Sequence, residues 1–132
     1  MPIPVENAIQ MIRTAHTQAT QLDIAITAVV VDEGGRMVAL GRMDRARPIT
    51  VEMALNKAYT AASFQQPTDQ LAGVASQAWF QSLVVSSNGR ITAGGGAQPI
   101  VEGGHVLGAI AVAGGTDAQD QQCCEVALAA NA

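Results

Sequence analysis

The chain has 132 residues, of which 48% are hydrophobic and 14% charged, and its formal net charge is −4 at pH 7. This length predicts a single domain spanning residues 1–132. The negative charge argues against nucleic acid and anionic membranes as partners, because both are themselves negative. No apolar run approaches the roughly 20 residues that a membrane-spanning helix needs, so we expect no membrane association.

The apolar content comes largely from Ala and Val, and aromatic residues make up only 3%. So many small apolar residues in a small domain predict that part of its surface is buried in a homo-oligomer. The start of the chain, MPIPVENAIQ, lacks the basic segment and apolar core of a signal peptide. Cys123 and Cys124 are neighbours on a predicted helix and do not favour a mutual disulfide. These features predict a cytoplasmic protein.

A helix and a hairpin are predicted at the start of the chain. Apolar residues at helical spacing predict an amphipathic helix over residues 4–21, with Pro4 at its first position. The β-prone run Ile24–Asp32 and the segment Met37–Met43 flank the turn Glu33–Arg36. Two strands around such a turn predict a β-hairpin.

The middle of the chain is predicted to be helical, with one ambiguous piece. The segment Asp44–Pro48 is polar and is predicted to be a loop. Alanines at helical spacing predict a helix over Thr50–Phe64 whose smooth face approaches a sheet closely. Thr68 is expected to cap a short helix that ends near Ser76. Residues Trp79–Ser86 are apolar without a clear period and are interpreted as a lid or a short strand.

The stretch Ile91–Asp120 is predicted to form the centre of the domain. Gln98–Val101 and the apolar run His105–Ala113 are predicted strands, joined by a tight turn at Gly103-Gly104. Thr116 begins a capping-box pattern that opens a closing helix, which extends to about Ala130. The order of elements predicts an α+β domain with antiparallel hairpins and helices packed against the sheet.

Glycines near this closing helix predict a small-ligand pocket. Their backbone N–H groups, together with the helix N-terminus at Thr116, are suited to an anion or a carbonyl oxygen. The glycines in question are Gly94, Gly95, Gly96, Gly114 and Gly115. Simple turn chemistry is the alternative interpretation, and the pattern matches neither a phosphate-binding loop nor a dinucleotide-binding motif.

Three charged residues are candidates for chemistry. The Arg42 guanidinium would hold a carboxylate in a bidentate pair, and Asp44 lies two residues further on. The alternative for both is a surface ion pair of little energetic worth. Lys57 lies on the alanine-rich helix, where it is either solvated or partly desolvated beside the pocket. Arg42, Asp44 and Lys57 are therefore the candidate catalytic residues.

Three segments together resemble a known family. They are VVVDEGGRMVALGRMDRA, ALNKAYTAASF and GGGAQPIVEGGHVLGAIAVAGGTDAQD. This combination resembles the GlcG/HbpS-like domains, which include the C-terminal domain of PduO-type proteins, from about Val5 to Leu128. The resemblance implies a profilin-like fold, a homo-oligomer, an association with haem, and small-molecule catabolism.

His16 is the candidate haem ligand. Some haem-binding relatives use a histidine on the first helix near an intersubunit surface, and a neutral imidazole supplies the nitrogen that haem iron accepts. The alternative is a core or interface histidine satisfied by a hydrogen bond. His105 follows the hairpin turn and is expected to be a solvated surface residue. No histidine or cysteine cluster predicts a zinc site.

Three functions remain open at this point. The first is a small-ligand binding protein that takes haem or a related tetrapyrrole through His16. The second is a cofactor-independent enzyme of isomerase, hydratase or lyase type that acts on a small carboxylate or carbonyl compound. There Arg42 would orient the anion, Lys57 would move protons, and the glycine amides would hold an oxyanion. The third is a non-catalytic oligomeric accessory protein.

Overall fold

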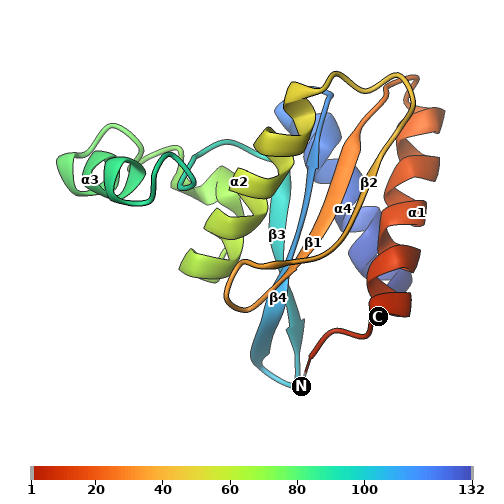
Figure 1. Ribbon diagram of the computed structural model, residues 1–132, viewed down its shortest axis with the longest axis horizontal. Coiled ribbons are helices and arrows are strands. Elements are labelled where there is room, and N and C mark those ends of the chain that lie inside the picture. The colour runs from red at the N-terminus through yellow and green to blue at the C-terminus, as the bar shows by residue number, and fades with distance from the viewer. Residues whose placement is uncertain (1, 132) are drawn as a thin grey trace.

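A four-stranded antiparallel sheet between helices forms the body of the computed structural model, which describes residues 2–131 (Figure 1). The strands are β1 (Thr27–Asp32), β2 (Met37–Arg42), β3 (Ala97–Glu102) and β4 (His105–Ala113). Their order across the sheet is β2-β1-β4-β3. Every neighbouring pair is antiparallel, so the predicted α+β class is confirmed.

The central strand β4 pairs with β1 on one side and with β3 on the other. Its second half, from Gly108 to Ala113, is buried, whereas His105 is exposed and Val106 and Leu107 are partly buried. The turn before it uses Gly103 and Gly104 with φ of +58° and +80°. Positive φ at both turn positions matches the right-handed twist of the flanking strands, which is why this hairpin needs two glycines.

One face of the sheet is covered by α1 (Val5–Gln21) and α4 (Asp117–Asn131). The core of this layer is apolar and includes Met11 and Ile12 from α1, Ile110 from β4, and Cys124 from α4. The predicted helix over residues 4–21 is confirmed, with Pro4 at its N-cap. The closing helix is confirmed as well, and it carries the candidate site on its first turn.

The opposite face is covered by α2 (Ile49–Phe64). This layer is built from alanines of the helix against small residues of the sheet: Ala54, Ala58, Ala61, Ala62, Ala109, Ala111 and Ala113. Because the side chains on both surfaces are small, the helix can lie close to the strands. That close approach brings the side chains of α2 to the end of the sheet.

Residues 68–86 depart from the predicted elements. Only Thr68–Leu71 form a short 3-10 helix, and Thr68 does not cap it: its hydroxyl is buried and donates to the Ala97 carbonyl at 3.5 Å. The segment interpreted as a lid or a short strand is a helix, α3 (Ala78–Ser86). A nine-residue segment that is apolar on all sides has no period to separate helix from strand, so the strand interpretation was wrong.

The helix α3 projects away from the sheet and its covering helices, at the left of Figure 1. Phe80 is its buried residue and packs with Leu71 and Ile91. The rings of Phe64, Trp79 and Phe80 form one cluster, with centroids 5.8 to 6.3 Å apart. Most of the few aromatic side chains therefore pack together to stabilise this projecting segment. Over the described residues, no helix has both the length and the apolar character to cross a membrane.

Candidate functional site

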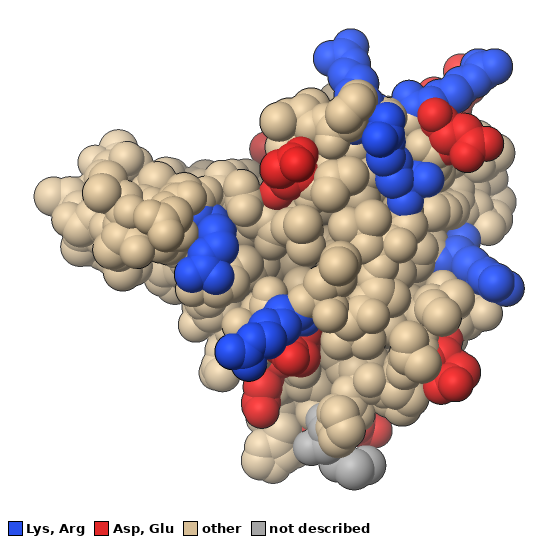
Figure 2. All heavy atoms as spheres, in the orientation of Figure 1, with Lys and Arg blue, Asp and Glu red and all other residues tan. Residues whose placement is uncertain are grey.

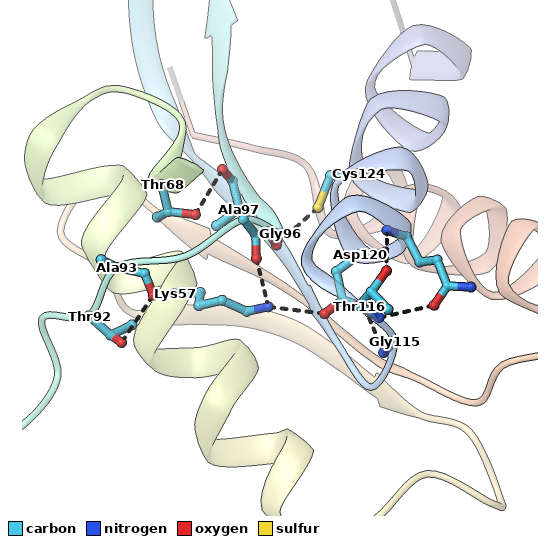
Figure 3. Close-up of polar contacts among 12 residues, drawn as sticks. Lys57, Thr68, Thr92, Ala93, Gly96, Ala97, Gly115, Thr116, Asp120 and Cys124 are labelled. Atoms are coloured by element: carbon cyan, nitrogen blue, oxygen red, sulfur yellow. Dashed lines mark hydrogen bonds and ion pairs between the residues drawn. The ribbon is translucent and has the colours of Figure 1, made fainter. Parts of the chain in front are cut away.

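A buried ion pair joins α2 to α4. The Lys57 ammonium lies 3.3 Å from Oδ2 of Asp120, and the two residues are only 6% and 2% exposed. The same ammonium donates to the Gly95 carbonyl oxygen at 3.2 Å. Figure 3 shows Lys57 reaching from α2 past the glycine segment toward the first turn of α4. Lys57 is therefore desolvated rather than solvated. Its charge partner is Asp120, which sequence analysis did not name.

The glycine segment allows this contact because it leaves space at the end of the sheet. α2 and α4 lie on opposite faces, and they approach each other only where residues 94–96 run into β3. Gly96 has φ of +114°, and a Cβ there would lie 2.5 Å from Lys57 Nζ and 2.8 Å from the Val112 carbonyl oxygen. Any larger residue would close the space that the lysine occupies.

Asp120 is held on both carboxylate oxygens. Oδ1 accepts from the Gly115 backbone N–H at 2.8 Å, and Oδ2 accepts from Lys57. Burial raises the pKa of this carboxyl above its ordinary value, while the Lys57 charge and the Gly115 N–H oppose the rise. The net effect is a pKa that remains raised, so desolvation is the dominant influence.

Two of the backbone N–H groups that were expected to face a ligand are occupied by side chains of α4. Gly115 donates to Asp120, while Thr116 N–H donates to the Gln119 side chain at 3.0 Å. The Thr116 hydroxyl accepts from Gln119 N–H at 3.2 Å, so the predicted capping box is formed. At the glycine run, the Gly95 carbonyl accepts from Lys57 and the Gly96 carbonyl accepts from the Cys124 thiol. Gly115 and Thr116 therefore hold the helix end and Asp120, and their amides are not free for an oxyanion.

The ion pair opens into a small cleft, here called the lysine cleft, of about 190 Å³. It is lined by Lys57, Asp120, Asp117, Gly94 and Thr92, among others. A second hollow of about 430 Å³, the arginine hollow, is lined by Arg45, Arg47, Thr50 and Gly114. Met53 and Gly115 line both, so the two spaces adjoin.

A third space, the histidine groove, brings together three of the predicted site residues. It measures about 560 Å³ and is lined by His16, Arg42, Asp44, Arg45, Ile24 and Met43, among others. Figure 2 shows basic and acidic side chains along the upper edge of the molecule, where Figure 1 places the loop that joins β2 to α2. The groove thus lies at a charged end of the domain.

His16 makes one hydrogen bond in this groove. Its Nε2 lies 2.9 Å from the Gly41 carbonyl oxygen. Because a carbonyl oxygen only accepts, Nε2 is the donor in this bond. Gly41 is required for this contact, since a Cβ there would lie 2.9 Å from His16 Cε1. His16 is therefore a hydrogen-bonded, half-buried histidine in the wall of the groove.

The predicted site residues do not form one site. Arg42 and Asp44 line the histidine groove, whereas Lys57 lines the lysine cleft. Arg42 Nε donates to the Ala46 carbonyl at 3.1 Å. Within residues 2–131, the ion pair of Lys57 with Asp120 is the one present, so an Arg42–Asp44 surface pair is not formed.

Both cysteine thiols are buried and unlinked. Burial raises the pKa of Cys123 to about 11, and it raises the pKa of Cys124 further still. Cys124 Sγ lies 3.2 Å from the Gly96 carbonyl oxygen, beside the ion pair. A thiol with so high a pKa is not a nucleophile at neutral pH, and no group of metal-binding side chains occurs among the described residues.

Asp120, which sequence analysis missed, had a detectable signal. Asp120 shares a helical face with Cys123, Cys124 and Ala127, at spacings of three, four and seven residues. Lys57 likewise shares a helical face with buried alanines of α2. A charged residue within the apolar face of a helix is expected to be buried. Two such residues of opposite charge are expected to form an ion pair.

Residues 3–129 match the family described as "Haem degrading protein HbpS-like". The chain belongs to this HbpS-like family. It is 34% identical to a protein of Citrobacter freundii, the uncharacterized 15.0 kDa protein in the dhaT-dhaS intergenic region, over 96% of this chain and 89% of that one. It is 31% identical to protein GlcG of Escherichia coli K12, over 77% and 74% of the two chains. The resemblance identified from sequence is thus confirmed.

Solved structures of similar proteins share the fold. The Klebsiella pneumoniae protein ORFY superposes with a TM-score of 0.92 at 32% identity, covering 98% of this chain and 90% of that one. A complex of PduOC with haem superposes at 0.91 with 27% identity, covering 98% and 95%. The chain also matches the corrinoid adenosyltransferase PduO of Citrobacter freundii at 28% identity, but it spans only 39% of that protein's length.

Proposed function

We propose that this HbpS-like protein binds haem or a related tetrapyrrole in the histidine groove, with His16 as the iron ligand. The observation that carries the proposal is the half-buried imidazole of His16, which lines a groove of about 560 Å³ together with arginines. Membership of a family described as haem-degrading, and the haem complex of the relative PduOC, support the same ligand.

The groove offers each kind of group that haem requires. His16 would supply an imidazole nitrogen for iron, and its bond to Gly41 would hold the ring in place. Arg42 and Arg45 supply guanidinium groups for the propionates. Ile24 and Met43 supply aliphatic surface for the macrocycle, because the aromatic cluster lies instead around α3. The residues present therefore fit haem, with Asp23 and Asp44 as the acidic exceptions.

Haemin titration followed by visible absorbance tests the proposal. We expect a saturable Soret shift for the wild-type protein and at least a tenfold weaker affinity for His16→Ala. Tenfold corresponds to about 1.4 kcal/mol of binding free energy. His105→Ala is the matched control, since His105 is exposed at the start of β4 and does not line the groove. Equal titrations for wild type and His16→Ala would reject His16 as the ligand.

We also propose that the protein is a homo-oligomer in which α3 packs against a second copy. The helix projects from the body of the domain, and Trp79, Leu83 and Val85 on it are 47%, 39% and 78% exposed. Exposed apolar side chains gathered on one projection are typical of an interaction surface.

Light scattering coupled to gel filtration measures this assembly. We expect the wild-type protein to have a mass that is a multiple of 13.6 kDa, and Leu83→Glu/Val85→Glu to have a lower one. Ser82→Glu is the control, because it adds a charge to the same helix without removing apolar surface. A wild-type mass of one chain, or an unchanged mass in the double variant, would contradict the proposed interface.

A further inference from the structure

We propose that the lysine cleft and the arginine hollow together bind a short carboxylate that carries a carbonyl or hydroxyl oxygen. Its carboxylate would lie against Arg45 and Arg47, and its second oxygen would accept a hydrogen bond from Lys57. This ligand site adjoins the histidine groove, with which it shares Arg45, but it does not depend on haem.

Lys57 has unused hydrogen-bonding capacity. An ammonium has three N–H donors, and in the structure two acceptors are within reach, the Gly95 carbonyl and Asp120 Oδ2. The side chain lines the lysine cleft although only 6% of the residue is exposed. The remaining donor is thus available in a largely desolvated place, where a hydrogen bond to a ligand is strongest.

The charges that line the lysine cleft are mainly negative. Lys57 contributes one positive charge, whereas Asp120 and Asp117 contribute two negative ones. A carboxylate would be repelled there, but a neutral carbonyl or hydroxyl oxygen would not. The cleft therefore selects the uncharged oxygen of a ligand rather than its anionic end.

The charges that line the adjoining arginine hollow are positive. Arg45 and Arg47 line it without an acidic neighbour in its wall, and neither forms an ion pair within residues 2–131. Guanidinium groups bind carboxylates in bidentate fashion, so the anionic end of a ligand belongs here. Met53 and Gly115 border both spaces, so one molecule can occupy them together.

The size of the lysine cleft limits the ligand. A cleft of about 190 Å³ takes only a small organic group, since a cavity of about 150 Å³ holds a single benzene molecule. The part of the ligand that enters is accordingly limited to a few carbons with their oxygen. The class that meets all three conditions is that of short oxo- and hydroxycarboxylates.

Calorimetric titration of the purified protein with 2-oxobutyrate, 3-hydroxybutyrate and 4-oxopentanoate tests the proposal. These three probes place the second oxygen at increasing distance from the carboxylate. We expect at least one to bind with Kd below 1 mM, equivalent to about −4.1 kcal/mol. Failure of all three would overturn the proposal.

Two analogues of the best probe then test the two ends separately. For 4-oxopentanoate they would be pentanoate, which lacks the carbonyl, and 2-pentanone, which lacks the carboxylate. We expect both to bind at least tenfold more weakly than the probe itself. Equal binding of the unsubstituted acid would remove Lys57 from the site, and equal binding of the neutral compound would remove the arginines.

Arg47→Gln provides the protein-side test, because Arg47 is exposed and lines only the arginine hollow among the three spaces. We expect a tenfold or greater loss of probe affinity with an unchanged melting temperature and unchanged haemin titration. Arg13→Gln, an exposed arginine on α1, is the matched control. His16→Ala should keep full probe affinity, so failure of the haem proposal and failure of this one are distinguishable. An unchanged affinity in Arg47→Gln would overturn the assignment.

Discussion

Replacing Lys57 with methionine is expected to lower the free energy of unfolding by about 3–5 kcal/mol at neutral pH, the usual cost of breaking a buried ion pair on one side. Methionine keeps the unbranched chain and much of the volume of lysine. What it removes is the charge that lies 3.3 Å from Asp120. Asp120 is 2% exposed, so its carboxylate would be left buried with only the Gly115 N–H as a partner. Urea denaturation followed by circular dichroism measures the loss.

The loss should depend on pH in a defined direction. Burial already raises the pKa of Asp120 above its ordinary 3.8, and without the ammonium the pKa would rise further. The folded variant then holds a proton that the unfolded chain has released, so its stability is intact below the ordinary pKa. That stability is lost as pH rises through the raised folded-state pKa. The deficit relative to wild type is therefore expected to be larger at pH 8 than at pH 5.

The double variant Lys57→Met/Asp120→Asn is the control for this interpretation. Its carboxamide is uncharged, and the amide oxygen can still accept from the Gly115 N–H. We expect it to recover most of the stability at pH 8 and to lose the extra pH dependence, because a buried pair can be replaced by neutral groups at little cost. A double variant as unstable as Lys57→Met would show that packing, not the uncompensated charge, causes the loss.

Gly96→Ala is expected to destabilise the protein by about 3–5 kcal/mol or to prevent folding, through strain and collision together. At φ of +114° an L-residue is strained, whatever space surrounds it. The added Cβ would in addition lie 2.5 Å from Lys57 Nζ and 2.8 Å from Asp120 Cβ. Either the backbone or the ion pair has to move.

Gly73→Ala is the matched substitution for Gly96→Ala. No atom lies within 4 Å of a Cβ at position 73, and its φ is not in the positive range. We expect a change within about 0.5 kcal/mol there, as for other surface substitutions. The two variants add the same methyl group but differ in its surroundings and in the backbone φ of the glycine that it replaces. Melting temperatures that fall equally in both would show that neither the space around Gly96 nor its φ is limiting.

Local sequence patterns determined most of the fold. Helical spacing located α1, α2 and α4, and the paired glycines at 103 and 104 located the turn between β3 and β4. These signals depend on neighbours in the chain, so no tertiary information is needed to interpret them. The apolar helix α3 and the buried Thr68 gave no such signal, because their conformations are set by packing and by a hydrogen bond to Ala97.

The candidate site, too, was predictable from the sequence only in part. The sequence by itself identified Lys57, His16 and Arg42 as residues with suitable chemistry, and it identified the glycines beside them. Only the tertiary structure decided that Lys57 pairs with Asp120, 63 positions away, and that Arg42 lies with His16 in a different space. The physical reason is that α2 and α4 cover opposite faces of one sheet and meet only at its end. The charge partner of a side chain depends on that meeting, which no local pattern encodes.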